Sequence, residues 1–125
     1  MLVDLKPNTV SDRARAYLER EHRMLIDGEW VGAVSKVRLD ASDPATGAVI
    51  ATFPAGEKAD IDLAVAAARR TFDDRTWRGI AATERAKILW RVADLIDGRR
   101  AEIVEIEVLN QGMPEYVANW SMNMA

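Results

Sequence analysis

Few side chains in this 125-residue sequence could do covalent or metal chemistry. The sequence contains no cysteine and a single histidine, His22, which excludes disulfides, thiolate metal sites and a cysteine nucleophile within it. His22 has no ligand partner nearby in the sequence, so we interpret it as a surface or packing residue. Serine and aspartate are present, but no spacing favours a catalytic triad with the one histidine.

Two pairs of carboxylates occur on predicted helices at a spacing of two residues, Asp60 with Asp62 and Glu105 with Glu107. Residues two apart do not share a helix face, so we interpret both pairs as solvated positions. The glycine-rich G-x-G-x-x-G turn and the P-loop, which bind phosphates, are both absent from the sequence. Its own residues therefore predict an α plus β module without an active site.

The composition, 49% hydrophobic and 30% charged, is that of an ordinary soluble globular domain. A formal net charge of -3 gives no charge-based reason to expect nucleic-acid binding. No apolar run approaches the roughly 18 residues of a membrane span, and the first residues do not resemble a secretion signal. We therefore expect a cytoplasmic protein that binds neither nucleic acid nor membrane.

Helical periodicity is clearest in residues 83–114, where Thr83 is the predicted N-cap. Gly98 predicts a break, after which a second helix is expected over residues 100–110 and ends at Gly112. The first of these helices carries one apolar arc, formed by Ile88, Leu89, Val92, Ala93, Leu95 and Ile96.

Three more helices are predicted, over residues 13–21 behind Ser11 and Asp12, over residues 58–72, and from residue 115 onward. The predicted buried stripe of the second is Ile61, Ala64, Val65, Ala68 and Phe72. In the first, Ala14, Tyr17 and Leu18 share one side. Residues 73–80 are expected to form a loop in which Trp77 is a packing anchor.

Two hairpins are predicted between the first helix and the second. Residues 24–31 flank Asp27-Gly28, a dipeptide that favours the positive φ angles of a type I′ turn. Strands over residues 37–41 and 48–53 flank a turn at residues 43–47. We expect the two hairpins to form one small antiparallel sheet, preceded by an arm over residues 1–10.

The order of these motifs resembles the N-terminal part of the NAD(P)-dependent aldehyde dehydrogenase superfamily. The motifs are L-I-D-G-E-W-V at 25–31, D-P-A-T-G-A-V-I-A at 43–51, D-I-D-L-A-V-A-A-A-R-R-T-F at 60–72, E-R-A-K-I-L-W-R-V-A-D-L-I at 84–96 and E-V-L-N-Q-G-M-P at 107–114. The lead-in A-Y-L-E-R-E-H-R at 16–23 resembles members that act on aromatic aldehydes, such as phenylacetaldehyde dehydrogenases.

The resemblance implies an incomplete aldehyde dehydrogenase-like α/β fold, with N-terminal antiparallel hairpins and the first helices of a Rossmann-like NAD-binding domain. Residues 1–23 would form an arm with a short helix, and residues 24–125 the N-terminal part of that domain. The family's chemistry uses a cysteine thiolate, hydride transfer to NAD or NADP, and a water activated by glutamate. The resemblance implies that the catalytic residues and the cofactor contacts lie outside this chain, which also contains no cysteine, so this chain alone is expected to bind no cofactor and to be inactive.

Two departures from the family pattern concern a turn and a candidate cation site. Asp43 replaces the usual asparagine, and both side chains can make the same local turn hydrogen bond. Some family members bind a structural monovalent cation at positions that correspond to Ala41, Ser42 and Asn110. Asn110 replaces a carboxylate there, which should weaken such a site, although backbone carbonyls could still contribute.

Two interpretations stay open at this point. The chain is the N-terminal fragment of an enzyme that oxidises an aldehyde to a carboxylic acid, produced by truncation or by a split gene. Its partners would then be the remainder of the enzyme or a complementary subunit, and the family resemblance implies a homo-oligomer. Alternatively, the chain is an autonomous, non-catalytic protein-interaction module. The sequence determines neither the aldehyde nor the choice between NAD and NADP.

Overall fold

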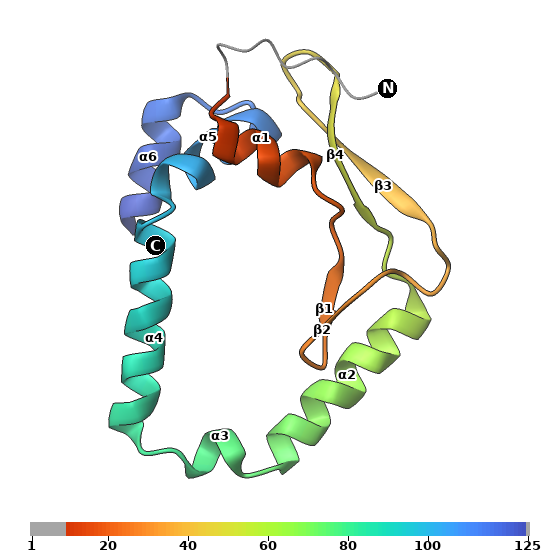
Figure 1. The fold of residues 1–125 in the computed structure, drawn as a ribbon, viewed down its shortest axis with the longest axis vertical. Helices are drawn as coiled ribbons and strands as arrows, with labels where there is room; N and C mark the ends of the chain where they lie inside the picture. Colours follow the sequence, from red (N-terminus) through yellow and green to blue (C-terminus); the bar gives the residue numbers. More distant parts are fainter. Residues whose placement is uncertain (1–9, 125) are drawn as a thin grey trace. The chain divides into compact units, whose positions relative to one another are not determined.

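The computed structural model describes residues 10–124, so most of the predicted arm lies outside the described residues. The elements in chain order are α1 (Asp12–Glu19), β1 (Met24–Ile26), β2 (Glu29–Val31), β3 (Arg38–Ser42), β4 (Val49–Pro54), α2 (Lys58–Asp73), α3 (Thr76–Gly79), α4 (Ala82–Asp97), α5 (Arg100–Gln111) and α6 (Glu115–Met124) (Figure 1). They form two compact units. The first contains the residues up to Glu21, Leu39–Phe53 and the residues from Gly98 onward, and the second contains His22–Arg38 and Pro54–Asp97.

Small apolar side chains form the core of the first unit, where α5 lies against both α1 and α6. Ala14 and Leu18 of α1, Val104 of α5 and Ala118 of α6 are all buried. Ser11 is the N-cap of α1, as predicted, because its side chain accepts a hydrogen bond from the Ala14 N–H at 3.3 Å. The short helix α1 is therefore supported both by its cap and by tertiary packing.

The hairpin of β3 and β4 also belongs mainly to the first unit, and its turn is fixed by Asp43. The carboxylate of Asp43 accepts hydrogen bonds from the Ala45 N–H at 2.9 Å and from the Thr46 hydroxyl at 2.8 Å. Gly47 has a φ of 72°, which a glycine adopts without strain. The predicted turn is confirmed, and the carboxylate accepts the hydrogen bonds that hold it.

The hairpin of β1 and β2 belongs to the second unit and pairs Met24 with Val31 and Ile26 with Glu29. Asp27 and Gly28 have φ angles of 56° and 82°, as the predicted type I′ turn requires. The prediction of one continuous sheet is wrong, because the two hairpins form two separate two-stranded sheets.

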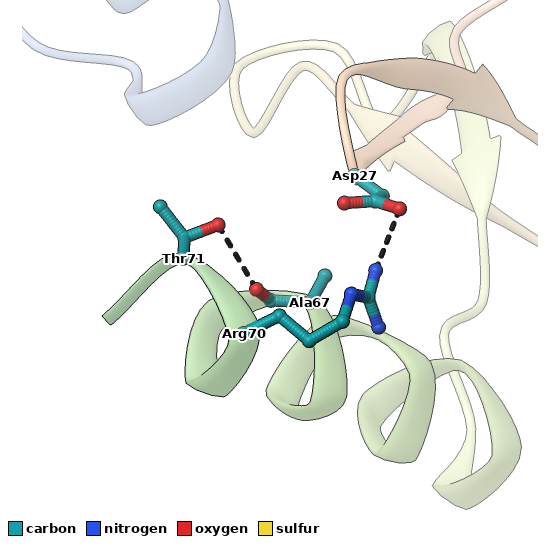
Figure 2. Close-up of polar contacts among 4 residues, drawn as sticks. All are labelled: Asp27, Ala67, Arg70 and Thr71. Carbon is teal, nitrogen blue, oxygen red and sulfur yellow. Dashed lines mark hydrogen bonds and ion pairs between the residues drawn. The ribbon is translucent and has the colours of Figure 1, made fainter. Parts of the chain in front are cut away.

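Helix α2 lies against β1 in the second unit. Figure 2 shows Arg70 of α2 reaching the hairpin turn, where its guanidinium contacts the Asp27 carboxylate at 2.6 Å. Both side chains are well exposed, so this ion pair contributes at most about 1 kcal/mol. In the same view the Thr71 hydroxyl donates to the Ala67 carbonyl at 3.0 Å.

Helices α4 and α5 confirm the predicted break near Gly98 and the predicted end at Gly112, which has a left-handed φ of 66°. The predicted N-cap Thr83 is wrong, since α4 already begins at Ala82. The carbonyl of Ala81 accepts the Glu84 N–H at 3.0 Å and the Arg85 N–H at 3.1 Å. The predicted loop over residues 73–80 contains the one-turn helix α3.

The predicted burial of the large apolar side chains is wrong within this chain. No residue of α4 is buried, and Leu89 in the middle of its apolar arc is 62% exposed. On α2 the buried residues are Asp60 and Ala67, whereas Val65 of the predicted stripe is 61% exposed. Trp77 is likewise exposed. Arg78 of α3 lies over the ring of Phe72 at 5.0 Å, but Val65 and Leu89 stay exposed in this unit, so the predicted apolar faces are not the buried faces here.

Candidate functional site

Asp60, in the first turn of α2, is the centre of a buried cluster of hydrogen bonds in the second unit. Its relative exposure is 2%. One carboxylate oxygen accepts the Val34 N–H at 3.0 Å, and the other accepts the Glu57 N–H at 3.0 Å. Glu57 and Asp60 also form a capping box at the start of the helix. The interpretation of Asp60 as a solvated residue is therefore wrong.

The electrostatics of this cluster favour an ionised carboxylate. Hydrogen bonds from the backbone N–H groups of Glu57 and Val34 lower the pKa of Asp60 below its ordinary value of 3.8, although burial acts in the opposite direction. The positive end of the α2 dipole acts in the same sense as the hydrogen bonds. Because both carboxylate oxygens accept backbone N–H groups, we assign Asp60 a structural role in joining the loop after β2 to α2.

Glu105 of α5 was also expected to be solvated; it is half-buried and makes a contact with Ser11 that the sequence analysis did not predict. Its carboxylate accepts hydrogen bonds from the Ser11 N–H at 2.9 Å and from the Ser11 hydroxyl at 2.6 Å. Ser11 thus receives a charged acceptor from α5 while it caps α1. Glu107 accepts a hydrogen bond from the Gln111 side chain at 2.5 Å, one helical turn away. Neither carboxylate pair is arranged for acid–base chemistry.

The three candidate cation positions lie in the first unit, at the end of β3 and near the end of α5. Ala41 is half-buried, whereas Ser42 and Asn110 are exposed. The end of α5 closely approaches the turn after β3, because a Cβ atom at Gly112 would lie 2.8 Å from Pro44 Cγ. The two segments are therefore neighbours, and cation binding at the three positions stays a prediction.

In the part of the chain that the structure describes, no set of residues could form a catalytic metal centre. Within residues 10–124, no group of three or more histidine, cysteine, aspartate or glutamate side chains could hold a metal ion. None of the helices over the same residues has the length and apolarity of a membrane span.

The backbone carbonyl of His22 accepts a weak hydrogen bond from Arg38 Nη2 at 3.4 Å, so this segment has a structural contact.

Comparison with known proteins gives the context for this structural site. The model of the aldehyde dehydrogenase family matches residues 30–124, which is most of the chain. The chain belongs to the aldehyde dehydrogenase family. This confirms the resemblance that was inferred from the order of the sequence motifs.

Two curated relatives of this aldehyde dehydrogenase chain illustrate the match. Aldehyde dehydrogenase 1 of Tanacetum cinerariifolium is 37% identical over 113 residues, which cover 90% of this chain and 23% of the relative. Phenylacetaldehyde dehydrogenase of Pseudomonas fluorescens is 38% identical over 95 residues, which cover 76% of this chain and 19% of the relative. The chain thus spans about a fifth of the length of the curated relatives it matches.

Solved structures confirm the predicted fold class. A betaine aldehyde dehydrogenase from Staphylococcus aureus, in complex with NAD+, superimposes with a TM-score of 0.84 at 32% identity. The match covers 88% of this chain and 22% of that structure. Two small hairpins followed by helices are thus an incomplete part of an aldehyde dehydrogenase-like α/β fold.

Sequence reasoning missed Asp60 and Glu105 as structural residues, for different reasons. The three-residue spacing of Glu57 and Asp60 is that of a capping box, so the contact between these two residues could have been predicted from the local sequence. The contact between Asp60 and Val34 spans 26 residues, and the one between Ser11 and Glu105 spans 94. A helix-face argument considers one helix at a time and cannot detect such contacts.

Proposed function

We propose that this chain is a structural portion of an oxidoreductase that oxidises an aldehyde to a carboxylic acid with NAD or NADP. The family match over residues 30–124 is the observation that carries this proposal. The NAD+ complex of the Staphylococcus aureus relative supports a nicotinamide cofactor for the complete enzyme. In this proposal residues 24–125 are the N-terminal part of the NAD-binding domain, and residues 1–23 precede it.

The proposal assigns this chain no catalytic step. It contains no cysteine that could act as the thiolate nucleophile, and the polar clusters at Asp60 and Glu105 hold backbone segments together. Their contribution to the enzyme is positional: Asp60 fixes the loop after β2 on α2, and Glu105 fixes the start of α1 on α5. The aldehyde, the cofactor and the other subunits would contact the remainder of the enzyme.

The test is an assay of NADH or NADPH production by the purified chain with aliphatic and aromatic aldehydes. We expect no turnover above background from the chain alone, and turnover when the remainder of the enzyme is supplied. Activity that copurifies with the chain would contradict the assignment of a structural role. A sharply melting monomer that gains no activity with the remainder would instead favour the autonomous interaction module.

The proposal includes a monovalent cation near Ala41, Ser42 and Asn110, supported by the close approach of Gly112 to Pro44. Carbonyl and carboxylate oxygens are the ligands that hard cations prefer. If the site binds sodium or potassium, Asn110→Asp should raise the melting temperature more in sodium or potassium chloride than in choline chloride of equal ionic strength. Equal melting temperatures in the three salts, for both the original chain and the variant, would remove the cation from the proposal.

A further inference from the structure

The turn between β1 and β2 places a carboxyl group directly before an unhindered backbone amide. Asp27 has a left-handed φ of 56° and Gly28 a φ of 82°. The Asp27 side chain is 61% exposed, and a Cβ atom at Gly28 would meet nothing within 4 Å. Because glycine has no side chain to shield its own nitrogen, the Gly28 amide is open to reaction with the carboxyl group that precedes it.

An aspartate before such a glycine can isomerise with no reagent other than water. The Gly28 nitrogen attacks Cγ of the protonated Asp27 carboxyl group, and the carboxyl hydroxyl leaves as water together with the amide proton. The product is a cyclic succinimide, in which a new N–Cγ bond replaces a C–O bond. Water then adds to one ring carbonyl and breaks its bond to nitrogen. Opening at Cγ returns aspartate, whereas opening at the backbone carbonyl gives isoaspartate, whose main chain runs through Cβ and Cγ.

The hairpin itself gives the turn the freedom that ring closure requires. β1 and β2 have three residues each and form a two-stranded sheet of their own. Such a sheet is marginally stable in water, so its turn opens more readily than a well-packed element. The second Asp-Gly pair of the sequence, Asp97-Gly98, lies at the end of α4, where Asp97 belongs to a helix of 16 residues.

One contact opposes the reaction at the hairpin, namely the ion pair between Arg70 of α2 and Asp27. Figure 2 shows the carboxylate directed toward α2, with one oxygen 2.6 Å from the Arg70 guanidinium. For ring closure the carboxyl group must leave the guanidinium, take up a proton and turn toward the Gly28 nitrogen. The ion pair therefore holds Asp27 in an unreactive arrangement.

We propose that Asp27 is a site of spontaneous isomerisation to isoaspartate and that its ion pair with Arg70 limits the rate. The isoaspartyl main chain is one carbon longer, so the turn between Ile26 and Glu29 no longer fits a two-residue loop. The carboxylate of the product is attached to Cα, and its contact with α2 is lost. The reaction requires only the chain and water, and it does not depend on the proposed function.

The experiment incubates the purified chain in water enriched in oxygen-18 and follows its tryptic peptides by mass spectrometry. Residues 24–36 contain Asp27 as their only aspartate, and residues 92–99 contain the second Asp-Gly pair. Opening of a succinimide introduces oxygen-18 into the aspartyl residue. Isoaspartate is then identified by methyl transfer from S-adenosylmethionine, catalysed by an isoaspartyl carboxyl methyltransferase.

Three variants separate the ion pair from a general change of charge on α2. Arg70→Gln removes the pair, and Arg70→Lys retains a positive charge that can reach the carboxylate. The matched control is Arg69→Gln, because the Arg69 guanidinium lies over the Phe72 ring at 5.6 Å. Arg70 is itself 61% exposed, so far-UV circular dichroism of its variants should match that of the original chain.

We expect oxygen-18 and isoaspartate in residues 24–36 of the original chain. An exposed ion pair restrains its partners only weakly, so Arg70→Gln should accelerate isomerisation by about two- to fivefold, with Arg70→Lys in between. Arg69→Gln should isomerise at the rate of the original chain. Added salt screens the pair and should accelerate the original chain but not Arg70→Gln, which tests the pair without a substitution.

The proposal would be overturned if residues 24–36 took up no label while a free peptide of the same sequence did. Label confined to residues 92–99 would also overturn it, because the reactive aspartate would then be Asp97. Equal rates for the original chain and Arg70→Gln, or equal acceleration by Arg69→Gln and Arg70→Gln, would refute the role of the ion pair.

Discussion

The close approach of Gly112 to Pro44 predicts that Gly112→Ala destabilises the first unit for two separable reasons. Gly112 ends α5 in the left-handed conformation, with a φ of 66°. A Cβ atom added there would lie 2.8 Å from Pro44 Cγ. Contacts that short do not persist, so either the α5 terminus or the turn after β3 must move.

The expected magnitude follows from these two costs. A non-glycine residue in the left-handed region costs roughly 1–2 kcal/mol, and overpacking against a neighbour typically costs about 1–3 kcal/mol. Gly112→Ala should therefore lower the free energy of unfolding by about 2–5 kcal/mol. Gly47 is the matched control, because its φ is 72° but a Cβ atom there would meet nothing within 4 Å. Gly47→Ala should cost only the roughly 1–2 kcal/mol of backbone strain.

The assay is urea unfolding followed by far-UV circular dichroism, for the two single variants and for the double variant Gly112→Ala with Pro44→Ala. Removal of the proline ring should recover the packing cost and leave the strain cost. Equal destabilisation by Gly112→Ala and Gly47→Ala, together with no recovery in the double variant, would refute the claim that α5 ends against this turn.

Three further outcomes are expected. Because the folded-state pKa of Asp60 is lowered, its stabilising contribution is present above the ordinary value of 3.8 and is lost as the pH falls through the folded-state value. Asp60→Asn should therefore reduce the loss of stability at acid pH. An unchanged dependence of the urea midpoint on pH between pH 2 and 6 would contradict this expectation. Ser11→Ala should lower stability by about 1 kcal/mol through loss of the cap, and Glu105→Gln should cost less, as measured by thermal melting. The isolated chain should bind an apolar-surface dye strongly and elute above its monomer size, because Val65 and Leu89 are exposed; a monomer that binds no dye would contradict this reading of the surface.

Local structure was predictable because its causes lie within a few residues. Asp27-Gly28 requires positive φ angles wherever the rest of the chain goes. Ser11 reaches the Ala14 N–H three residues away, and Gly112 ends α5 without strain. Thr83 failed as a cap because α4 begins one residue before it, at Ala82, and no local rule places a helix end to a single residue.

Burial was not predictable, since it depends on partners that a periodic pattern does not specify. Leu89 and Val65 lie on apolar faces, as their spacing indicated, yet both are exposed because no described residue of this unit covers them. Asp60 shows the opposite error. Its charge predicted exposure to solvent, but the buried carboxylate accepts hydrogen bonds from two backbone N–H groups, one of them from a residue 26 positions away. The structural site was therefore missed where its contacts were distant in sequence.

The hydrogen bonds between Ser11 and Glu105 determine the order in which the two units can fold during synthesis. The two residues are 94 positions apart, which corresponds to roughly 5–19 seconds of synthesis at ribosomal speeds. During that interval α1, with only eight residues, is too short to persist as a helix by itself. The second unit, which is complete at Asp97, can assemble first. The first unit closes only when α5 leaves the ribosome, so α1 is synthesised early but is among the last helices to reach its folded position.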